Sequence, residues 1–252
     1  MLKQKGVHEF TCSRRGELQL PIRLWRIIPV LSSIQMINFT KRLIILIKWL
    51  VGGRKGISPH HTQEDIYLEV LSALAEAIDA KDHSTRGHSE RMVKFVTFVA
   101  KNIGMTEHEL KDLEMAAILH DVGKIGIDKS VFLKPGKLTF DEYEIIKKHS
   151  TIGANIISRI SFLKGVAEYI KHHHERWDGN SYPDKLKGEA IPLGARILAV
   201  VDSFDAMMSE RSYKKPMALT EALTELKKNS GTQFDAKIVT EFLKYDFQSA
   251  TL

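Results

Sequence analysis

Residues 88–121 read HSERMVKFVTFVAKNIGMTEHELKDLEMAAILHD, and this stretch decides the expected fold. Apolar residues recur at helical spacing in its first half until Gly104, a residue type that commonly ends a helix. Thr106 and Glu109 then stand three residues apart, as in a capping box that opens the next helix. The stretch therefore predicts two consecutive helices. Their expected inward residues are Met92, Val96, Val99 and Ile103 in the first, and Leu110, Leu113 and Ala117 in the second.

The helical pattern continues on both sides of this stretch. Before it, apolar residues recur every four positions from Ile66 to Ile78, and after it Thr139 and Glu142 form a second capping box. Strand-like alternation is scarce, so we expect an all-α domain that closes with short helices at 218–229 and 235–244. The other expected inward residues are Ile145, Ile146, Ile152 and Ile156, then Val166 and Ile170, then Ile197, Val200, Val201, Phe204 and Met208.

The composition is that of a soluble globular protein. The chain has 252 residues, of which 43% are hydrophobic and 27% are charged. Its one cysteine, Cys12, excludes an internal disulfide framework and a cysteine-based zinc or iron–sulfur site. A reducing cytosol is the simplest compartment for such a chain, so we expect a cytoplasmic protein.

The N-terminal quarter differs from the rest in charge. Residues 1–62 hold 11 Lys/Arg and 2 Asp/Glu, whereas residues 63–252 hold 26 and 29. Glycines and a proline between positions 52 and 59 indicate a linker, so we expect a basic N-terminal segment at 1–62 and a second domain at 63–252. The uncharged run 27–40 is shorter than the about 18 apolar residues that a membrane span needs. No small-residue cleavage site follows a compact apolar run, so we expect no signal peptide.

The function of this basic segment is open. An amphipathic helix over 41–51 would place residues 1–51 in peripheral contact with the inner face of a membrane. A solvated extension, a regulatory element or a dimerising element that forms a homodimer are the alternatives. Nucleic-acid binding is a weaker one, because the basic residues are interleaved with aliphatic rather than aromatic side chains.

Histidines and aspartates of the second domain fall where helical bundles build metal sites. His88, His120, His149 and Asp202 belong to four different expected helices, and a run of histidines at 172–174 ends another. An inward carboxylate such as Asp202 is costly to bury unless it is paired or binds a metal. Nitrogen and oxygen ligands without thiolate favour Fe, Mn or Zn over Ca or Mg. We therefore expect a binuclear metal site, which can activate a hydroxide for attack on a phosphoester.

Six motifs along residues 64–244 occur in a fixed order: Asp82–Arg91, Ala117–Ile125, His149–Gly153, His173–Pro183, Arg196–Tyr213 and Gly231–Asp235. Together they resemble the HD-GYP family, a bacterial signalling subclass of the HD phosphohydrolases. The resemblance implies an HD-type helical bundle with extra C-terminal helices. It also implies a metal-dependent phosphodiesterase, a hydrolase that cleaves cyclic di-GMP.

The resemblance also implies roles for individual residues. Lys124 would contact the scissile phosphate, and Arg211 and Lys214 would hold the substrate phosphates. Asp205, Glu175 and Asp82 would support the ligands or act as auxiliary ones. The implied ligands are His88, His120, Asp121 and Asp202 for the first metal, and the bridging Asp121 with His149, His173 and His174 for the second.

Two positions depart from the family's pattern. Members with three metals carry a Glu four residues before the first ligand histidine, and Ser84 stands there in this chain, so we expect two divalent ions, iron or manganese. The name-giving Gly-Tyr-Pro is Ser181-Tyr182-Pro183. Serine disfavours the positive φ that glycine adopts freely, so we expect a reshaped loop. None of these loop residues is an implied metal ligand. The replacement of glycine by Ser181 would therefore affect substrate fit or partner binding more than the hydrolytic reaction.

The implied function is hydrolysis of cyclic di-GMP to linear pGpG, with onward cleavage to GMP left open. One alternative is a weakly active or inactive module that binds a cyclic dinucleotide or a protein partner, such as a diguanylate cyclase-type enzyme. Another is an enzyme acting on a different cyclic dinucleotide, such as the mixed GMP–AMP ring. The sequence by itself identifies no base-reading residue.

Other residues near these motifs have structural interpretations. Trp177 would stack on a guanine or anchor its loop. Glu175 and Asp178 would orient ligand histidines or order the loop. We expect His172 to be a helix-end residue, and we expect exposed positions for His60, His61, His83 and His108.

Overall fold

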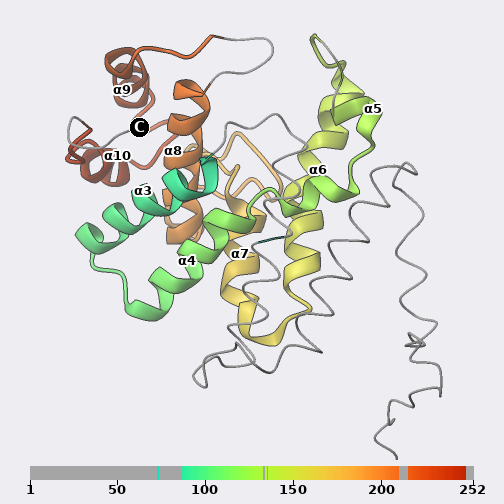
Figure 1. Cartoon of the computed structure of the whole chain (residues 1–252), viewed down its shortest axis with the longest axis horizontal. Coiled ribbons are helices and arrows are strands. Elements are labelled where there is room, and N and C mark those ends of the chain that lie inside the picture. The colour runs from blue at the N-terminus through green and yellow to red at the C-terminus, as the bar shows by residue number, and fades with distance from the viewer. Residues whose placement is uncertain (1–72, 74–86, 133, 135, 210–214, 248–252) are drawn as a thin grey trace, which may run out of the picture. The chain divides into compact units, whose positions relative to one another are not determined.

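The computed structural model describes residues 73, 87–132, 134, 136–209 and 215–247 (Figure 1). Every regular element of these residues is a helix, which confirms the predicted all-α class. Of the expected helix around Ile66–Ile78 only Ala73 is described, and it is helical. The rest of that helix, the basic segment at 1–62 and the domain boundary lie outside the described residues and stay predictions. None of the described helices is long and apolar enough to cross a membrane.

The helices agree with the predicted order, and several short ones are additional. Neither the four-residue α5 nor the three short 3-10 helices, labelled η, could be predicted from periodicity. The elements are α3 (His88–Ile103), α4 (Glu107–Leu119), η2 (Val122–Gly126), α5 (Lys129–Phe132), α6 (Phe140–Ile157), η3 (Ser161–Leu163), α7 (Lys164–His172), η4 (Gly188–Ala190), α8 (Leu193–Met208), α9 (Leu219–Lys228) and α10 (Ala236–Phe242).

The predicted helix boundaries follow from local chemistry. Thr106 and Glu109 form a capping box at the start of α4, and Thr139 and Glu142 form another at the start of α6. In each, the threonine hydroxyl accepts the backbone N–H of the glutamate, which satisfies a donor that the first helical turn leaves free. Gly104 ends α3 with φ 84°, a conformation that glycine adopts at little cost. Both capping boxes and the glycine stop are confirmed.

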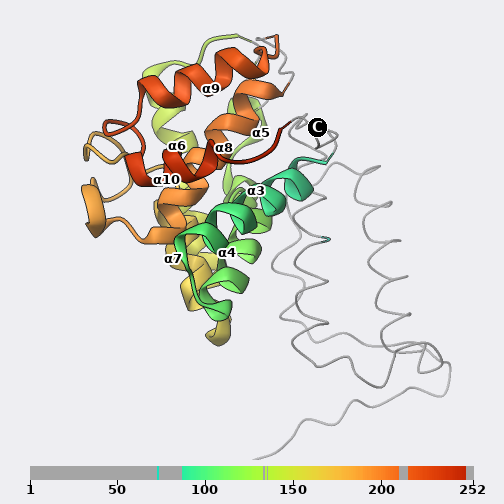
Figure 2. The same ribbon diagram turned by 90° about the vertical axis from the view of Figure 1, so that its left-hand side faces the viewer.

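An aromatic cluster joins the first and last helices of the described domain. Phe95 of α3 lies edge-on to Phe204 of α8 and to Phe242 of α10, with ring centroids 5.5 Å apart in each pair. Phe247 packs against all three rings from beyond α10. Both views show α9 and α10 beside α8 (Figure 1, Figure 2). The C-terminal helices therefore belong to the same core as α3 and α8, which fixes those two helices relative to each other.

The inward face of α6 differs from the predicted one. Ile145 is 37% exposed, so its placement in the core was wrong. The buried face instead runs through His149, Ser150, Gly153, Ala154 and Ile157, in the second half of the helix. The first turns carry exposed Phe140 and Tyr143. The apolar period alone could not show which turns of the helix are covered.

A close backbone contact joins η2 to α6. A Cβ atom placed on Gly123 would lie 1.9 Å from the carbonyl oxygen of His149 and 2.5 Å from the backbone nitrogen of Gly153. Both obstacles are backbone atoms, which cannot move aside as a side chain can. Only glycine fits at position 123, and its absent side chain lets the turn after His120 and Asp121 lie directly on α6.

We expect Gly123→Ala to destabilise the protein by about 1–3 kcal/mol or more, because the added methyl group must push two helices apart. The free energy of unfolding from urea denaturation measures this. Gly126→Ala in the same short helix is the matched control, since its Cβ would meet only the side chain of Ile152, at 3.1 Å. Equal losses in the two variants would contradict the role given to the backbone contact.

Candidate metal centre

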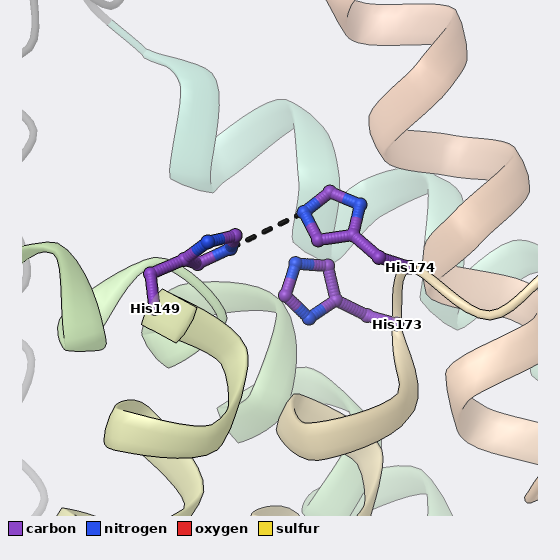
Figure 3. Close-up of side chains that lie close together, drawn as sticks. All are labelled: His149, His173 and His174. Atoms are coloured by element: carbon purple, nitrogen blue, oxygen red, sulfur yellow. Dashed lines mark hydrogen bonds between the residues drawn. The ribbon is translucent and has the colours of Figure 1, made fainter. Parts of the chain in front are cut away.

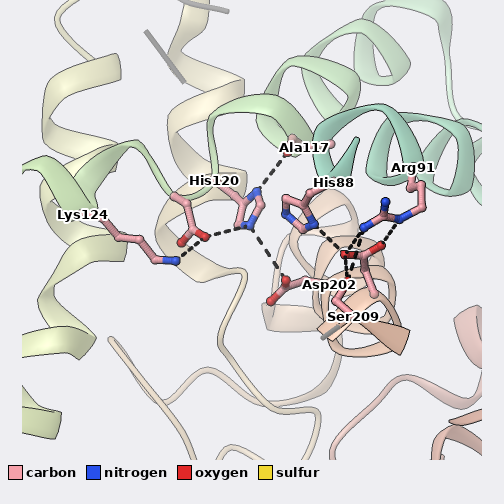
Figure 4. Close-up of polar contacts among 9 residues, drawn as sticks. His88, Arg91, Ala117, His120, Lys124, Asp202 and Ser209 are labelled. Carbon is pink, nitrogen blue, oxygen red and sulfur yellow. Dashed lines mark hydrogen bonds and ion pairs between the residues drawn. The ribbon is translucent and has the colours of Figure 1, made fainter. Parts of the chain in front are cut away.

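Two separate groups of metal-ligand side chains form in the described residues. The first contains His88 of α3, His120 at the end of α4 and Asp202 of α8, with one donor atom of each within 4.8 Å of the others. Figure 4 shows these side chains meeting from three helices. His120 is 3% exposed, and the Asp202 side chain is 21% exposed. The three implied ligands of this group, which lie far apart in sequence, are therefore brought together.

The second group contains His149 of α6 and the neighbours His173 and His174, which follow α7. The Nε2 atoms of His149 and His174 are 3.2 Å apart, and the His173 ring lies beside both (Figure 3). With metal–nitrogen bonds of about 2.1 Å, two ligands of one ion lie about 3 Å apart. The spacing therefore fits two imidazoles on a shared cation.

Asp121 lies between the two groups. Its Oδ2 is 3.4 Å from Nε2 of His120, and its Oδ1 is 3.5 Å from Nε2 of His149. Lys124, one turn later, places its Nζ 2.6 Å from Oδ2. One carboxylate thus presents an oxygen to each group, which is the arrangement expected of a bridging ligand.

Backbone carbonyl groups orient three of the imidazole rings. The Nδ1 atoms of His120, His149 and His173 lie 2.9, 2.7 and 2.6 Å from the carbonyl oxygens of the residues three positions earlier. Each Nδ1–H therefore donates to the preceding turn of its own helix, and each ring turns its Nε2 towards the centre.

Two of these inward nitrogen atoms are buried without a hydrogen bond, although Nε2 of His120 lies 3.4 Å from Asp121 and 3.9 Å from Asp202. Nε2 of His120 and Nε2 of His173 have no hydrogen bond among the described residues. An unsatisfied buried polar group costs about 1–3 kcal/mol, so such atoms are rare unless they serve a ligand. A cation would satisfy both, and the all-nitrogen and oxygen donor set suits a transition metal. The residues present therefore fit metal ions.

His88 is oriented by a side chain instead. Its Nδ1 donates to Oδ2 of Asp205 at 2.7 Å. Arg91 holds the same carboxylate with Nε at 2.6 Å from Oδ1 and a terminal nitrogen at 3.1 Å from Oδ2, and the Ser209 hydroxyl lies 3.1 Å from Oδ2. Asp205, predicted as a supporting residue, thus contacts a ligand histidine. The sequence assigned no role to Arg91. Its position three residues after the expected ligand His88, on the same helix, could have indicated that it lies near this ligand.

Burial keeps the second group uncharged. It lowers the pKa of His149, lowers the pKa of His174 to about 4, and lowers the pKa of His173 well below the usual range. For His173 and His174 the neighbouring imidazoles act in the same direction, because adjacent positive charges repel. The neutral imidazole is the form that binds a metal.

Two carboxylates lie close together in the first group and its bridge. Burial lowers the pKa of His120, but the carboxylates of Asp121 and Asp202 outweigh it and raise the pKa to about 9. Burial raises the pKa of Asp121, but Lys124 and His120 outweigh it and hold that pKa well below the usual range. Both carboxylates therefore attract positive charge, which a bound cation would supply.

Several predicted residues lie apart from the two groups. His172 ends α7 as expected, with Nδ1 3.0 Å from the Glu168 carbonyl oxygen and Nε2 3.0 Å from the carboxylate of Asp184. His108 is exposed, also as expected. Asp82, His60, His61, His83, Ser84, Arg211 and Lys214 lie outside the described residues, and their predicted roles stay predictions.

The loop at 175–192 is ordered by its own contacts. Glu175 accepts the backbone N–H of Asp184 at 2.7 Å, and Asp178 pairs with Arg176 at 2.7 Å. Of the two roles predicted for these acids, ordering the loop is therefore the one that the contacts support. The Trp177 backbone donates to Gln233 at 3.0 Å, and Arg196 lies 5.6 Å above the Trp177 ring, so this tryptophan anchors the loop.

The family's glycine position in this loop does not need glycine here. Among the described non-glycine residues only Lys185 has a positive φ, of 56°. Ser181 therefore has a negative φ, which serine tolerates, and the positive φ of a glycine at this position does not occur.

A family model described as "HD domain" matches residues 72–238. The chain belongs to the HD domain family. The match covers all the residues of both groups, and it confirms the predicted HD-type family.

Two curated relatives of this HD domain chain are bacterial proteins. "Cyclic di-GMP phosphodiesterase" of Thermotoga maritima is 44% identical over 185 residues, covering 73% of this chain and 50% of the relative. "Cyclic di-GMP phosphodiesterase response regulator RpfG" of Xanthomonas campestris pv. campestris is 47% identical over 183 residues, covering 72% and 48%. The chain thus spans about half the length of these relatives.

A solved structure supports the fold assignment. The crystal structure of a cyclic GMP-AMP specific phosphodiesterase of Vibrio cholerae superposes with a TM-score of 0.56 at 26% identity, covering 70% of this chain and 48% of that one. The predicted HD-type helical fold is therefore confirmed.

We expect Asp205→Asn to weaken metal binding about 10–100-fold, because the His88 ring loses the carboxylate that orients it. Competition with a chelator measures the affinity. Asp235→Asn is the matched control: Asp235 also pairs with an arginine, Arg196, at 2.7 Å, but contacts neither histidine group. A similar loss of affinity in both variants would contradict the orienting role.

Acid should destabilise the metal-free protein through the second group. The unfolded chain takes up protons on these histidines near pH 6.5, whereas the folded chain resists, with a pKa of about 4 at His174. The free energy of unfolding should therefore fall as pH drops from about 6.5 towards 4. Urea denaturation at pH 7 and pH 5 should give a smaller drop for His174→Gln than for wild type or for the exposed-site control His108→Gln. An unchanged drop in His174→Gln would refute the assignment.

Proposed function

We propose that residues 63–252 form a metal-dependent phosphodiesterase that hydrolyses cyclic di-GMP to linear pGpG. The observation that carries the proposal is the pair of imidazole and carboxylate groups with Asp121 between them. Relatives named as cyclic di-GMP phosphodiesterases support the choice of reaction. Onward cleavage of pGpG to GMP is a further outcome that product analysis would reveal.

Two divalent metal ions, iron or manganese, are the proposed cofactors. When bound, they would supply Lewis acidity and an activated water at neutral pH. The first group with Asp121 would hold one ion, and the second group with Asp121 would hold the other. Burial of His149 and His173 would keep bulk water away from these ligands, which strengthens electrostatic interactions with a phosphate.

Lys124 is the proposed phosphate contact within the described residues. Its Nζ lies 2.6 Å from Asp121 and 5.3 Å above the Phe132 ring, so the ammonium group is held at the edge of the centre. A fixed positive charge there would stabilise negative charge that develops on the phosphoryl oxygens. Arg211 and Lys214 are proposed to hold the substrate phosphates from the segment that follows α8.

The remaining proposals concern the whole chain. Residues 1–62 are proposed to be a basic segment that contacts the inner face of a membrane or forms a homodimer, in a cytoplasmic protein. A diguanylate cyclase-type enzyme is the proposed protein partner. Deleting residues 1–58 and measuring how the protein partitions between membrane and cytosolic fractions would test the membrane contact.

The central test compares two neighbouring buried histidines. We expect His173→Gln to lower turnover of cyclic di-GMP about 100-fold or more and to lower the metal content, because a ligand is lost. His172→Gln should keep both, since that ring contacts Glu168 and Asp184 instead. Anaerobic purification, metal analysis and product analysis on one sample provide the measurements, and circular dichroism checks the fold.

Three outcomes of this experiment would overturn the proposal or part of it. Full turnover by His173→Gln would remove the metal centre from the mechanism. Wild-type protein that holds metal but leaves cyclic di-GMP intact would favour a binding module. When the mixed GMP–AMP ring is assayed on the same sample, its faster turnover would change the substrate while keeping the reaction.

A further inference from the structure

A pocket opens beside the second histidine group. It has a volume of about 430 Å³, which is within the usual range for small-ligand sites, and it includes Tyr143 and Lys147 of α6 and residues of the loop at 179–185. The Tyr182 ring, which lines it, lies 5.1 Å from the ring of His174. Lys147 precedes the ligand His149 by two residues on the same helix. The pocket therefore adjoins the candidate metal centre without containing any of its ligands.

Aromatic rings and ammonium groups share this pocket. Nζ of Lys147 lies 4.8 Å from the centroid of Tyr143 and 5.4 Å from that of Tyr182. Nζ of Lys147 also forms an ion pair with Glu144. Its charge is thus partly balanced, while an ammonium group keeps further N–H donors for a neutral acceptor. This favours a base carbonyl over a second phosphate as the group that Lys147 contacts.

Lys185 supplies a second ammonium group. It is exposed, lines the pocket and forms no ion pair with any described residue. Its φ of 56° lies in the left-handed region, which is unfavourable for a lysine and natural for a glycine. A lysine therefore stands at a position where the backbone would favour glycine.

We propose that this pocket binds the guanine base of one nucleotide of the substrate and selects guanine over adenine. Guanine presents two acceptors, O6 and N7, on one edge, whereas adenine presents N7 and an N6 amino donor that ammonium groups repel. Tyr143 and Tyr182 offer aromatic surfaces against which a purine can stack. The inference rests on the proposed function, since it concerns the base attached to the phosphate at the metal centre.

The test replaces each lysine and measures base preference. Lys147→Met keeps the side-chain volume, and Lys185→Gly relieves the backbone strain, so both variants should fold. Lys148→Met is the matched control, because Lys148 is the next residue of α6, is exposed and does not line the pocket. Calorimetry of manganese-loaded protein with GMP and with AMP gives the ratio of the two affinities without any turnover. The kcat/KM ratio for cyclic di-GMP against cyclic di-AMP is measured in parallel.

The wild type and Lys148→Met should bind GMP about tenfold more tightly than AMP, and each pocket variant should lower this ratio by about threefold or more. AMP affinity should change less than twofold. Equal losses for GMP and AMP, or an unchanged ratio in both pocket variants, would overturn the inference. A protein that prefers GMP through these lysines but hydrolyses no cyclic dinucleotide would refute the proposed function and leave the base pocket standing.

Discussion

The candidate centre depends on hydrogen bonds that fix imidazole rings against the preceding turn of their own helices. In His120, His149 and His173 the Nδ1–H group donates to a carbonyl oxygen three residues earlier, which orients each ring and turns its Nε2 towards the centre. His120 and His173 stand at the ends of α4 and α7, where the last carbonyls have no intrahelical partner, whereas His149 lies in the middle of α6. The convergence of the two groups therefore follows from how these helices pack against one another.

Tight helix packing brings these ends together. Gly123 lets the turn that carries Asp121 lie directly on the backbone of α6, so that one carboxylate reaches both groups. The packing leaves buried ring nitrogen atoms without hydrogen bonds and crowds carboxylates and imidazoles together. Such a cluster is unfavourable by itself, and its cost is offset when a cation binds. Metal binding and folding stability should therefore be coupled in this domain.

The C-terminal helices contribute to the site through the loop at 175–192. Trp177 binds the turn before α10 through its backbone and lies beneath Arg196, whose other partner is Asp235 at the start of α10. This anchoring holds Tyr182 beside His174 and forms one wall of the adjacent pocket. The extra helices thus position the loop that lines this pocket, although none of their own side chains belongs to either metal group.

Local patterns in the sequence determined the all-α class, both capping boxes and the glycine that ends α3, because each depends on residues within a few positions of one another. The family motifs also contain the side chains that meet in the two groups. Only the tertiary structure decided that Ile145 is exposed, that Arg91 holds Asp205 against His88, and that Lys147 and Lys185 share a pocket. These outcomes depend on which helix covers which face and on contacts between residues up to 117 positions apart. No local period or propensity encodes such contacts.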